Sequence, residues 1–217
     1  MSDRKARGDR RYSGEEVDIL YNRARCIHAE YCIHGLDTVF ERDRRVWIDA
    51  NGASAQDIAA VIEQCPSGAL HYERKDGAQE VVPAANTVRV RSNGPLEVRG
   101  DLTVSATDEP LHDTRMTLCR CGASKNKPFC DNSHLHNGFE AASPNPGEVV
   151  PERPAGGPLT IIPTANGPFE VQGTFALVNE AQAVIAVKDG AWLCRCGHSA
   201  NKPFCDGTHR RGGFTTE

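Results

Sequence analysis

Short stretches in which apolar and polar residues alternate recur along the whole chain, and they predict β-strands. They lie at residues 17–21, 39–40, 46–48 and 71–72, then at 87–91, 96–99, 102–104 and 116–118, and finally at 159–162, 169–171, 176–178, 184–187 and 192–193. A period of two is typical of strands with one buried face. We therefore expect many short strands joined by turns.

One stretch has helical spacing instead. Residues 55–63 place Ile58, Val61 and Ile62 on one face, and Ser54 precedes them as a candidate N-cap. A helix that buries this apolar face fits between the strands of residues 13–75. The combination of this helix with the strands around it, followed by strand-rich sequence, predicts an α+β fold class.

A sixteen-residue segment occurs twice in the second half of the chain. Residues 119–134 (CRCGASKNKPFCDNSH) and 194–209 (CRCGHSANKPFCDGTH) agree at twelve positions, with a constant offset of 75. A second segment is repeated upstream, at 93–100 (NGPLEVRG) and 166–173 (NGPFEVQG). The duplicated unit is therefore a whole small β-rich module and not just one loop.

Each copy of the segment supplies three thiols and one imidazole with the spacing C-x-C-x8-C-x3-H. The donors are Cys119, Cys121, Cys130 and His134 in the first copy, and Cys194, Cys196, Cys205 and His209 in the second. In an extended segment, residues two apart point to the same side and can reach one metal. Residues four apart share a face if Asp131 opens a helical turn. Each copy is thus a complete four-ligand set for a metal centre.

These segments resemble the CDGSH iron–sulfur family, whose motif ends in Cys-Asp-Gly-Ser-His. The resemblance implies a [2Fe–2S] cluster on a small β-fold in each copy. The inner iron would be held by Cys119 and Cys121, or by Cys194 and Cys196, and the outer iron by Cys130 and His134, or by Cys205 and His209. Asn132 replaces the glycine of the motif, and Asn tolerates a left-handed turn. Thr208 replaces the serine and keeps its hydroxyl.

Other polar residues of the repeated loops have two interpretations each. Lys127 and Lys202 either tune the cluster potential by their charge or are simply solvated. Asp131 and Asp206 either orient the neighbouring ligand or cap the ligand turn, and we expect capping.

The first third of the chain holds three more cysteines, Cys26, Cys32 and Cys65, the last followed by proline. C-x5-C with a distant Cys-Pro is the layout of a single-cluster bacterial ferredoxin, except that Ala29 occupies the middle cysteine position. Residues 13–75 resemble the divergent mono-cluster 4Fe–4S domain family. The resemblance implies [4Fe–4S], whereas three thiolates alone suit [3Fe–4S]. With these residues a [4Fe–4S] cluster would need a borrowed fourth ligand, either His28 or solvent. Buried free cysteines are the alternative.

These observations divide the chain into three modules with connectors. We expect a disordered tail at 1–12, a ferredoxin-like domain at 13–75, a linker at 76–86, the first CDGSH-type module at 87–140, a linker with five prolines and three glycines at 141–158, and the second module at 159–217. The expected architecture is a small α+β module followed by two β-rich ones. If these two pair about a pseudo-twofold axis, the chain is monomeric.

Composition and charge narrow the functional classes. The net charge of -4 gives no reason to expect nucleic acid or an anionic membrane as partner. The sequence has no apolar run that could span a membrane and no signal peptide. An odd total of nine cysteines, with C-x-C pairs, disfavours disulfides and favours a reducing, cytoplasmic location. The sequence also has no phosphate-binding loop and no G-x-S-x-G motif.

The sequence therefore predicts a soluble multi-cluster iron–sulfur protein that transfers single electrons to and from redox partner proteins. Its cofactors would be two [2Fe–2S] clusters and one [3Fe–4S] or [4Fe–4S] cluster. Cluster storage, cluster transfer and redox sensing are alternatives within the same chemistry. A zinc-stapled interaction scaffold is another, since three cysteines and one histidine also suit tetrahedral zinc. We do not expect an enzyme, which would need a catalytic cluster with an open iron.

Overall fold

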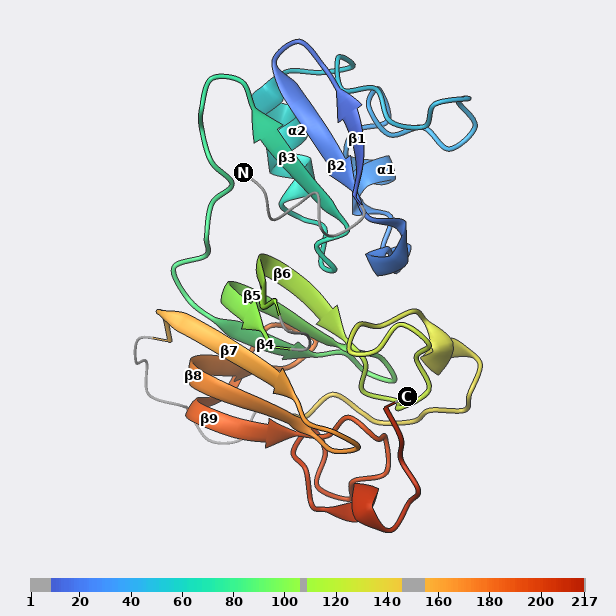
Figure 1. Cartoon of the computed structure of the whole chain (residues 1–217), viewed down its shortest axis with the longest axis vertical. Coiled ribbons are helices and arrows are strands. Elements are labelled where there is room, and N and C mark those ends of the chain that lie inside the picture. Colours follow the sequence, from blue (N-terminus) through green and yellow to red (C-terminus); the bar gives the residue numbers. More distant parts are fainter. Residues whose placement is uncertain (1–8, 106–108, 146–154, 217) are drawn as a thin grey trace. The chain divides into compact units, whose positions relative to one another are not determined.

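A computed structural model describes residues 9–105, 109–145 and 155–216 of the chain. It divides into two compact units, residues 1–81 and 82–217, and each is described by itself (Figure 1). The two repeated modules both lie in the second unit. No helix within the described ranges is long and apolar enough to cross a membrane.

The N-terminal unit is a three-stranded antiparallel sheet with helices between its second and third strands. The strands are β1 (Arg10–Ser13), β2 (Val17–Tyr21) and β3 (Leu70–Arg74), in the order β1-β2-β3; the helical segments are η2 (Arg23–Arg25), α1 (Tyr31–Gly35) and α2 (Ala55–Ile62). Ser54 caps α2 as expected, because its Oγ accepts a hydrogen bond from the Asp57 N–H at 3.2 Å. Ile58 and Ile62 of α2 are fully buried in the core of this unit.

Two details of this unit differ from the sequence-based expectation. The expected tail is wrong for residues 10–12, because β1 begins at Arg10 and Tyr12 is buried; the rest of this expectation, at residues 1–8, lies outside the described part. The short strands expected at 39–40 and 46–48 are reduced to one bridge between Phe40 and Ile48. Both side chains are buried, so their apolar character reflects burial in a loop.

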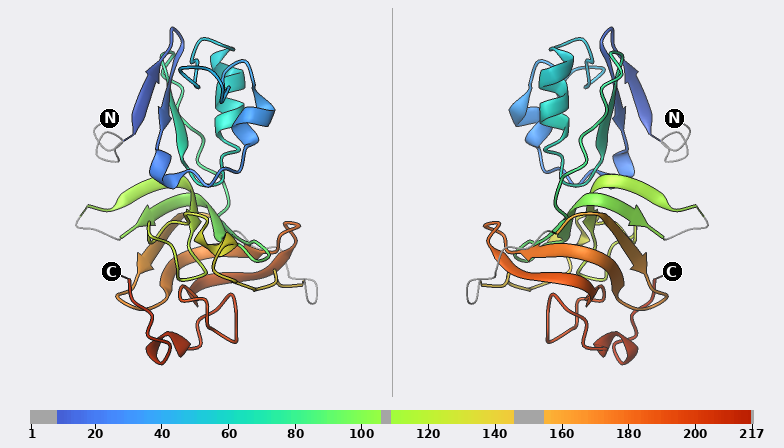
Figure 2. Two further views of the ribbon diagram at one scale, coloured as in Figure 1. Left: turned by 90° about the vertical axis from the view of Figure 1, so that its right-hand side faces the viewer. Right: turned by 90° about the vertical axis from the view of Figure 1, so that its left-hand side faces the viewer.

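The second unit is a six-stranded sheet to which each module contributes three strands. They are β4 (Thr87–Val90), β5 (Leu96–Val104) and β6 (Leu111–Leu118), then β7 (Pro158–Pro163), β8 (Phe169–Val178) and β9 (Val184–Leu193). Strands β4 and β7 each pair antiparallel with the long strand of their own module and parallel with that of the other. Figure 2 shows the resulting curved sheet from two sides.

The strand pairings between modules obey the symmetry of the repeat. Thr87 lies opposite Ala176, and Thr160 lies opposite Thr103. The same offset of 73 residues leads from 87 to 160 and from 103 to 176. The two modules are therefore related by a pseudo-twofold axis within one chain, in the way that an isologous dimer relates two chains.

Several strands expected as separate pieces are single bent strands. Residues 96–99 and 102–104 both belong to β5, whose register shifts between Arg99 and Leu102. Gly100 lies at this bulge with φ of +147°, and a Cβ there would collide with the Asn86 side chain. A bulge with glycine bends a strand without ending it. Strand β8 bends in the same way around Gly173.

Apolar residues from both modules form one core. Fully buried members include Val88, Leu102 and Met116 from the first module and Leu159, Phe175 and Leu177 from the second. Asn86, expected at the end of the linker at 76–86, is 1% exposed and donates hydrogen bonds to the carbonyls of Gly157 (2.8 Å) and Thr174 (2.9 Å). The described chain is thus mostly β, and it is not clearly α+β as a whole, because its α-helices belong to the N-terminal unit.

Candidate metal centres

The donor residues form three groups, which we name by position. The first centre is Cys119, Cys121, Cys130 and His134; the second centre is Cys194, Cys196, Cys205 and His209; the N-terminal centre is Cys26, Cys32 and Cys65. All nine cysteines are free.

Strand ends position the donors of the first centre. Cys119 directly follows β6, and its N–H donates to the Pro128 carbonyl at 2.9 Å, while the Cys130 N–H donates to the Thr117 carbonyl at 2.9 Å. These bonds fold the loop back onto β6, so both cysteines emerge from one short ladder. His134 lies on the 3-10 turn η3 (Ser133–Leu135). The second centre follows β9 in the same way and ends on η4 (Thr208–Arg210).

Within each of these centres the donors form two close pairs. Sγ of Cys119 lies 3.8 Å from Sγ of Cys121, and Sγ of Cys130 lies 3.5 Å from Nδ1 of His134. The corresponding distances are 3.9 Å and 3.4 Å in the second centre. A tetrahedral metal with bonds of about 2.3 Å to thiolate and about 2.0 Å to imidazole separates two sulfurs by about 3.8 Å, and a sulfur and a nitrogen by about 3.5 Å.

The pairing fits a dinuclear cluster. Each donor pair has the separation that one metal atom requires, so the two pairs of a centre could each hold one iron. No three Cys, His, Asp or Glu side chains converge as a site for one ion anywhere in the described ranges. Cys119 and Cys194 are almost fully buried, whereas both histidines are partly exposed. The histidines are therefore the donors nearer to solvent, although in the first centre Cys130 is buried and Cys121 is only partly so.

The thiols of the first centre differ in pKa, and therefore in how readily they become the thiolates that bind iron. The neighbouring Cys119 thiol, by hydrogen bonding, lowers the pKa of Cys121 to about 6. Burial raises the pKa of Cys130 to about 12. A buried thiol of this kind becomes a thiolate only when a cation compensates its charge, so binding of iron would release protons.

Polar side chains order the ligand loops. Asp131 accepts hydrogen bonds from the N–H groups of Ser133 (3.0 Å) and Lys125 (2.8 Å), so its carboxylate caps the ligand turn and also ties it to the loop. The Lys127 ammonium donates to the Ser124 carbonyl at 2.7 Å. Asn132 has φ of +69°, the left-handed conformation expected for it, as Gly207 has in the second loop.

The N-terminal centre has three thiols around one pocket. Cys26 follows η2, Cys32 lies on α1 and Cys65 follows α2, and all three line this pocket together with Ala29. Ala29 thus occupies a wall of the pocket where a fourth cysteine would stand. Burial, with the negative charge of Cys65, raises the pKa of Cys32 to about 11. A cuboidal cluster would meet thiolates on three sides.

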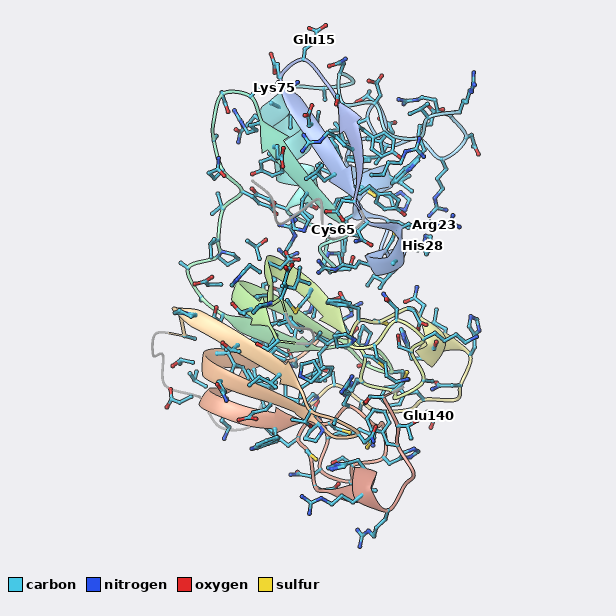
Figure 3. All side chains as sticks on the ribbon, in the orientation of Figure 1. Glu15, Arg23, His28, Cys65, Lys75 and Glu140 are labelled. Atoms are coloured by element: carbon cyan, nitrogen blue, oxygen red, sulfur yellow. The ribbon has the colours of Figure 1, made fainter. Side chains whose placement is uncertain are left out.

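His28 has a different place from the one considered for a fourth ligand. It lines a neighbouring cavity of about 490 Å³ with Cys26 and Cys32, but it does not line the pocket that all three cysteines share. Figure 3 labels His28 and Cys65 at one end of the N-terminal unit, opposite Glu15 and Lys75. Tyr21 and Trp47 line both the pocket and the cavity, although the sequence analysis did not single them out. Their rings pack edge to face with 4.9 Å between the ring centroids.

Comparison with known proteins agrees with these sites. Residues 12–75 match the family described as "Divergent 4Fe-4S mono-cluster", and residues 93–135 and 166–210 each match "Iron-binding zinc finger CDGSH type". The chain is also similar to "Uncharacterized protein YjdI" from Escherichia coli K12 and from E. coli O157:H7. Each is 38% identical over 68 residues, which are 31% of this chain and 90% of the relative.

The matched ranges include all the donors described above. Residues 12–75 contain the N-terminal centre, and the two later ranges contain the first and second centres, with Cys119 to His134 and Cys194 to His209 inside them. These family matches indicate that the chain is an iron–sulfur cluster-binding protein. The protein belongs to the CDGSH-type iron-binding family through its two C-terminal modules and to the divergent 4Fe-4S mono-cluster family through its N-terminal domain.

Proposed function

We propose that this chain is an electron carrier that exchanges single electrons with redox proteins. The proposal rests on one observation above all: the first and second centres each arrange their donors as a Cys–Cys pair and a Cys–His pair, and each pair has the separation that suits one metal atom. When bound, a [2Fe–2S] cluster accepts and releases one electron at a time. The proposed content is two [2Fe–2S] clusters and one [3Fe–4S] or [4Fe–4S] cluster.

The histidine ligands set the working range of the carrier. His134 and His209 each replace a thiolate by a neutral imidazole, so each centre carries one negative charge less than a four-cysteine site. Less negative charge favours the reduced state and raises the reduction potential. Because Nδ1 faces the cysteine in both pairs, Nε2 remains available for a proton. Reduction is therefore expected to depend on pH.

The chain is proposed as a carrier and not as an enzyme. The three cysteines of the N-terminal centre supply the third redox site, with Ala29 in place of a fourth ligand. Reversible electron exchange tests the proposal: the protein should be reduced by a one-electron donor protein and reoxidised by an acceptor with its iron content unchanged. Loss of iron in each cycle would overturn it.

Cluster delivery is the second candidate, and the partly exposed His134 and His209 favour it. A ligand at the outer edge that takes up a proton is the first bond to open. Mixing the loaded protein with an apo-ferredoxin separates the two functions. Stoichiometric transfer of the cluster on the time scale of mixing supports delivery, and its absence supports electron carriage.

The shared sheet supports a monomeric carrier, since the two modules already pair with each other within one chain. The nine free cysteines favour a reducing compartment. Light scattering tests the first point: we expect the mass of one chain, and a stable dimer as the only species would contradict it.

A further inference from the structure

The two ligand loops touch through a reciprocal glycine contact. A Cβ on Gly122 would lie 2.6 Å from the carbonyl oxygen of Cys196, and a Cβ on Gly197 would lie 2.8 Å from that of Cys121. Real Cβ atoms do not come this close, so both positions require glycine, and both have positive φ, +81° and +84°. The backbones of the segments 119–122 and 194–197, which we call the C-R-C-G segments, therefore lie in direct contact.

Each C-R-C-G segment carries a buried arginine. Arg120 and Arg195 are 1% and 4% exposed. Arg120 donates from Nε to the Gly94 carbonyl (2.9 Å) and from Nη2 to the Ala141 carbonyl (3.0 Å), and Arg195 donates from Nη1 to the Thr164 carbonyl (3.1 Å). Neither guanidinium has a carboxylate partner among the described residues. A buried charge without one is costly unless another negative group compensates it.

Both arginines keep a buried N–H that no described residue accepts. These are Nη1 of Arg120 and Nε of Arg195. The two arginines are equivalent in the repeat, so each C-R-C-G segment contains one buried guanidinium N–H without an acceptor in the described part of the chain. With clusters bound, the ligand thiolates and the clusters themselves would supply the negative charge at the contact.

For each arginine, the cysteine with the largest electrostatic effect lies in the other module. Burial lowers the pKa of Arg120 to about 10, and attraction to Cys194 opposes this more than attraction to Cys121 does. Burial also lowers the pKa of Arg195, and Cys119 of the other module opposes it. The contact between the C-R-C-G segments therefore brings each arginine within electrostatic reach of a cysteine of the opposite centre, and Arg120 also of Cys121 in its own.

We propose that the first and second centres are coupled across this contact, and that each arginine stabilises the reduced state of the centre in the other module. An electron taken from a one-electron donor adds one negative charge to a centre without forming or breaking a bond. Arg120 then stabilises that charge at the second centre, and Arg195 stabilises it at the first. Buried charges are screened far less than exposed ones, so these two cations outweigh those of the surface. The inference rests on the proposed electron carriage.

The test measures midpoint potentials in the full-length, loaded protein. His134→Cys serves as a marker that changes the spectrum of the first centre, so that the two centres are titrated separately. In this background, Arg120→Gln should lower the potential of the second centre more than that of the first. With His209→Cys as the marker, Arg195→Gln should do the reverse. Arg195→Gln is also an independent test if Arg120→Gln fails to bind its clusters.

A matched control removes an exposed charge. Lys125 lies in the first ligand loop, its side chain is exposed, and the second loop has Ala200 at this position. Lys125→Gln should shift neither potential by as much as an arginine variant does. If each arginine variant instead shifts mainly the centre of its own module, or shifts no more than Lys125→Gln, the crossed coupling is wrong.

A second experiment tests whether the coupling depends on the backbone contact between the two C-R-C-G segments. Gly122→Ala introduces the clash with Cys196, whereas Gly138→Ala changes a glycine with φ of +69° that has no atom within 4 Å of the new Cβ. With iron and sulfide retained, the shift caused by Arg120→Gln should shrink in the Gly122→Ala background and persist in the Gly138→Ala background. An undiminished shift in the Gly122→Ala background would overturn the role of the contact. Crossed shifts without electron exchange would refute the carrier function and leave the coupling intact.

Discussion

His134 presents Nδ1 to Cys130, with 3.5 Å between that nitrogen and Sγ, and the same relationship holds between His209 and Cys205 at 3.4 Å. The imidazole therefore faces the cysteine by its Nδ1 edge in each centre. In the proposed clusters Nδ1 would hold the metal and Nε2 would take up the proton, which would link the charge of the ligand to pH.

Replacing this histidine should change both the potential and its pH dependence. His134→Cys and His209→Cys each exchange a neutral ligand for a thiolate, so the added negative charge disfavours reduction. We expect the midpoint potential of the altered centre to fall and its dependence on pH to flatten, because no proton is taken up at Nε2. Protein-film voltammetry between pH 6 and 9 measures both.

A histidine in the same loop that is not a ligand provides the control. His198 lies in the second loop, and its counterpart in the first is Ala123. Its backbone N–H donates to Sγ of the ligand Cys196 at 3.4 Å, and this N–H is retained in His198→Ala. The variant should keep the potential and its slope with pH; unchanged values in His209→Cys as well would contradict the ligand assignment.

The N-terminal centre should hold a complete [4Fe–4S] cluster when Ala29 becomes cysteine. Ala29 lines the pocket shared by Cys26, Cys32 and Cys65, so Ala29→Cys supplies a fourth thiolate in the C-x2-C-x2-C layout. We expect a stable [4Fe–4S] cluster, with iron content equal to or about one atom above that of the parent, and a spectrum without any [3Fe–4S] signal. Anaerobic iron analysis with EPR measures this.

His28→Ala accompanies that experiment. His28 faces the neighbouring cavity and does not line the shared pocket. Its removal should leave the iron content of the parent unchanged. Loss of one iron in this variant would identify His28 as a ligand after all.

Asp131 should stabilise the first ligand loop in a manner that depends on pH. Burial opposes its ionisation, yet hydrogen bonds from Ser133 and Lys125 hold its pKa below the ordinary 3.8. A lowered pKa means that the stabilisation is full above about pH 4 and is lost as the pH falls through the value in the folded state. Asp131→Ala should cost about 1–3 kcal/mol at pH 7 and less at pH 3.

Urea unfolding followed by tryptophan fluorescence measures this difference. The same variant should lose the colour of the first centre faster than the parent at pH 7, because the ligand turn is no longer tied to the loop. An equal loss of stability at pH 7 and pH 3 would show that the charge of Asp131 plays no part.

Asn86 should contribute strongly to the stability of the second unit. Its side chain donates to the carbonyls of Gly157 and Thr174 and accepts from the Asp101 N–H at 3.1 Å. Removing this buried side chain deletes all three hydrogen bonds, so Asn86→Ala should lower the free energy of unfolding by roughly 2–4 kcal/mol. The exposed Asn145→Ala should change it by less than about 0.5 kcal/mol. Similar effects of the two changes would refute this role.

Local patterns in the sequence predicted the donors and the helix. The Cys and His residues of the repeats needed only their spacing, and Ser54 with the apolar face of 55–63 was enough for α2. Arg10–Ser13 escaped notice because only Tyr12 of this short strand faces the core and its neighbours are polar. A charged edge strand has the composition of a tail.

Contacts between distant residues could not be predicted in this way. The parallel pairing of β4 with β8 joins residues about 90 positions apart, and no local pattern encodes it. The glycines of the C-R-C-G segments did carry a signal, since Gly122 and Gly197 are identical in both copies. Their function depends on the approach of the other loop, which only the fold brings about.

Iron and acid-labile sulfide in protein purified without oxygen test the central claim most directly. Two [2Fe–2S] clusters and one cuboidal cluster predict about seven or eight irons per chain with a similar amount of sulfide. Zinc in a colourless protein, with no labile sulfide, would contradict the account.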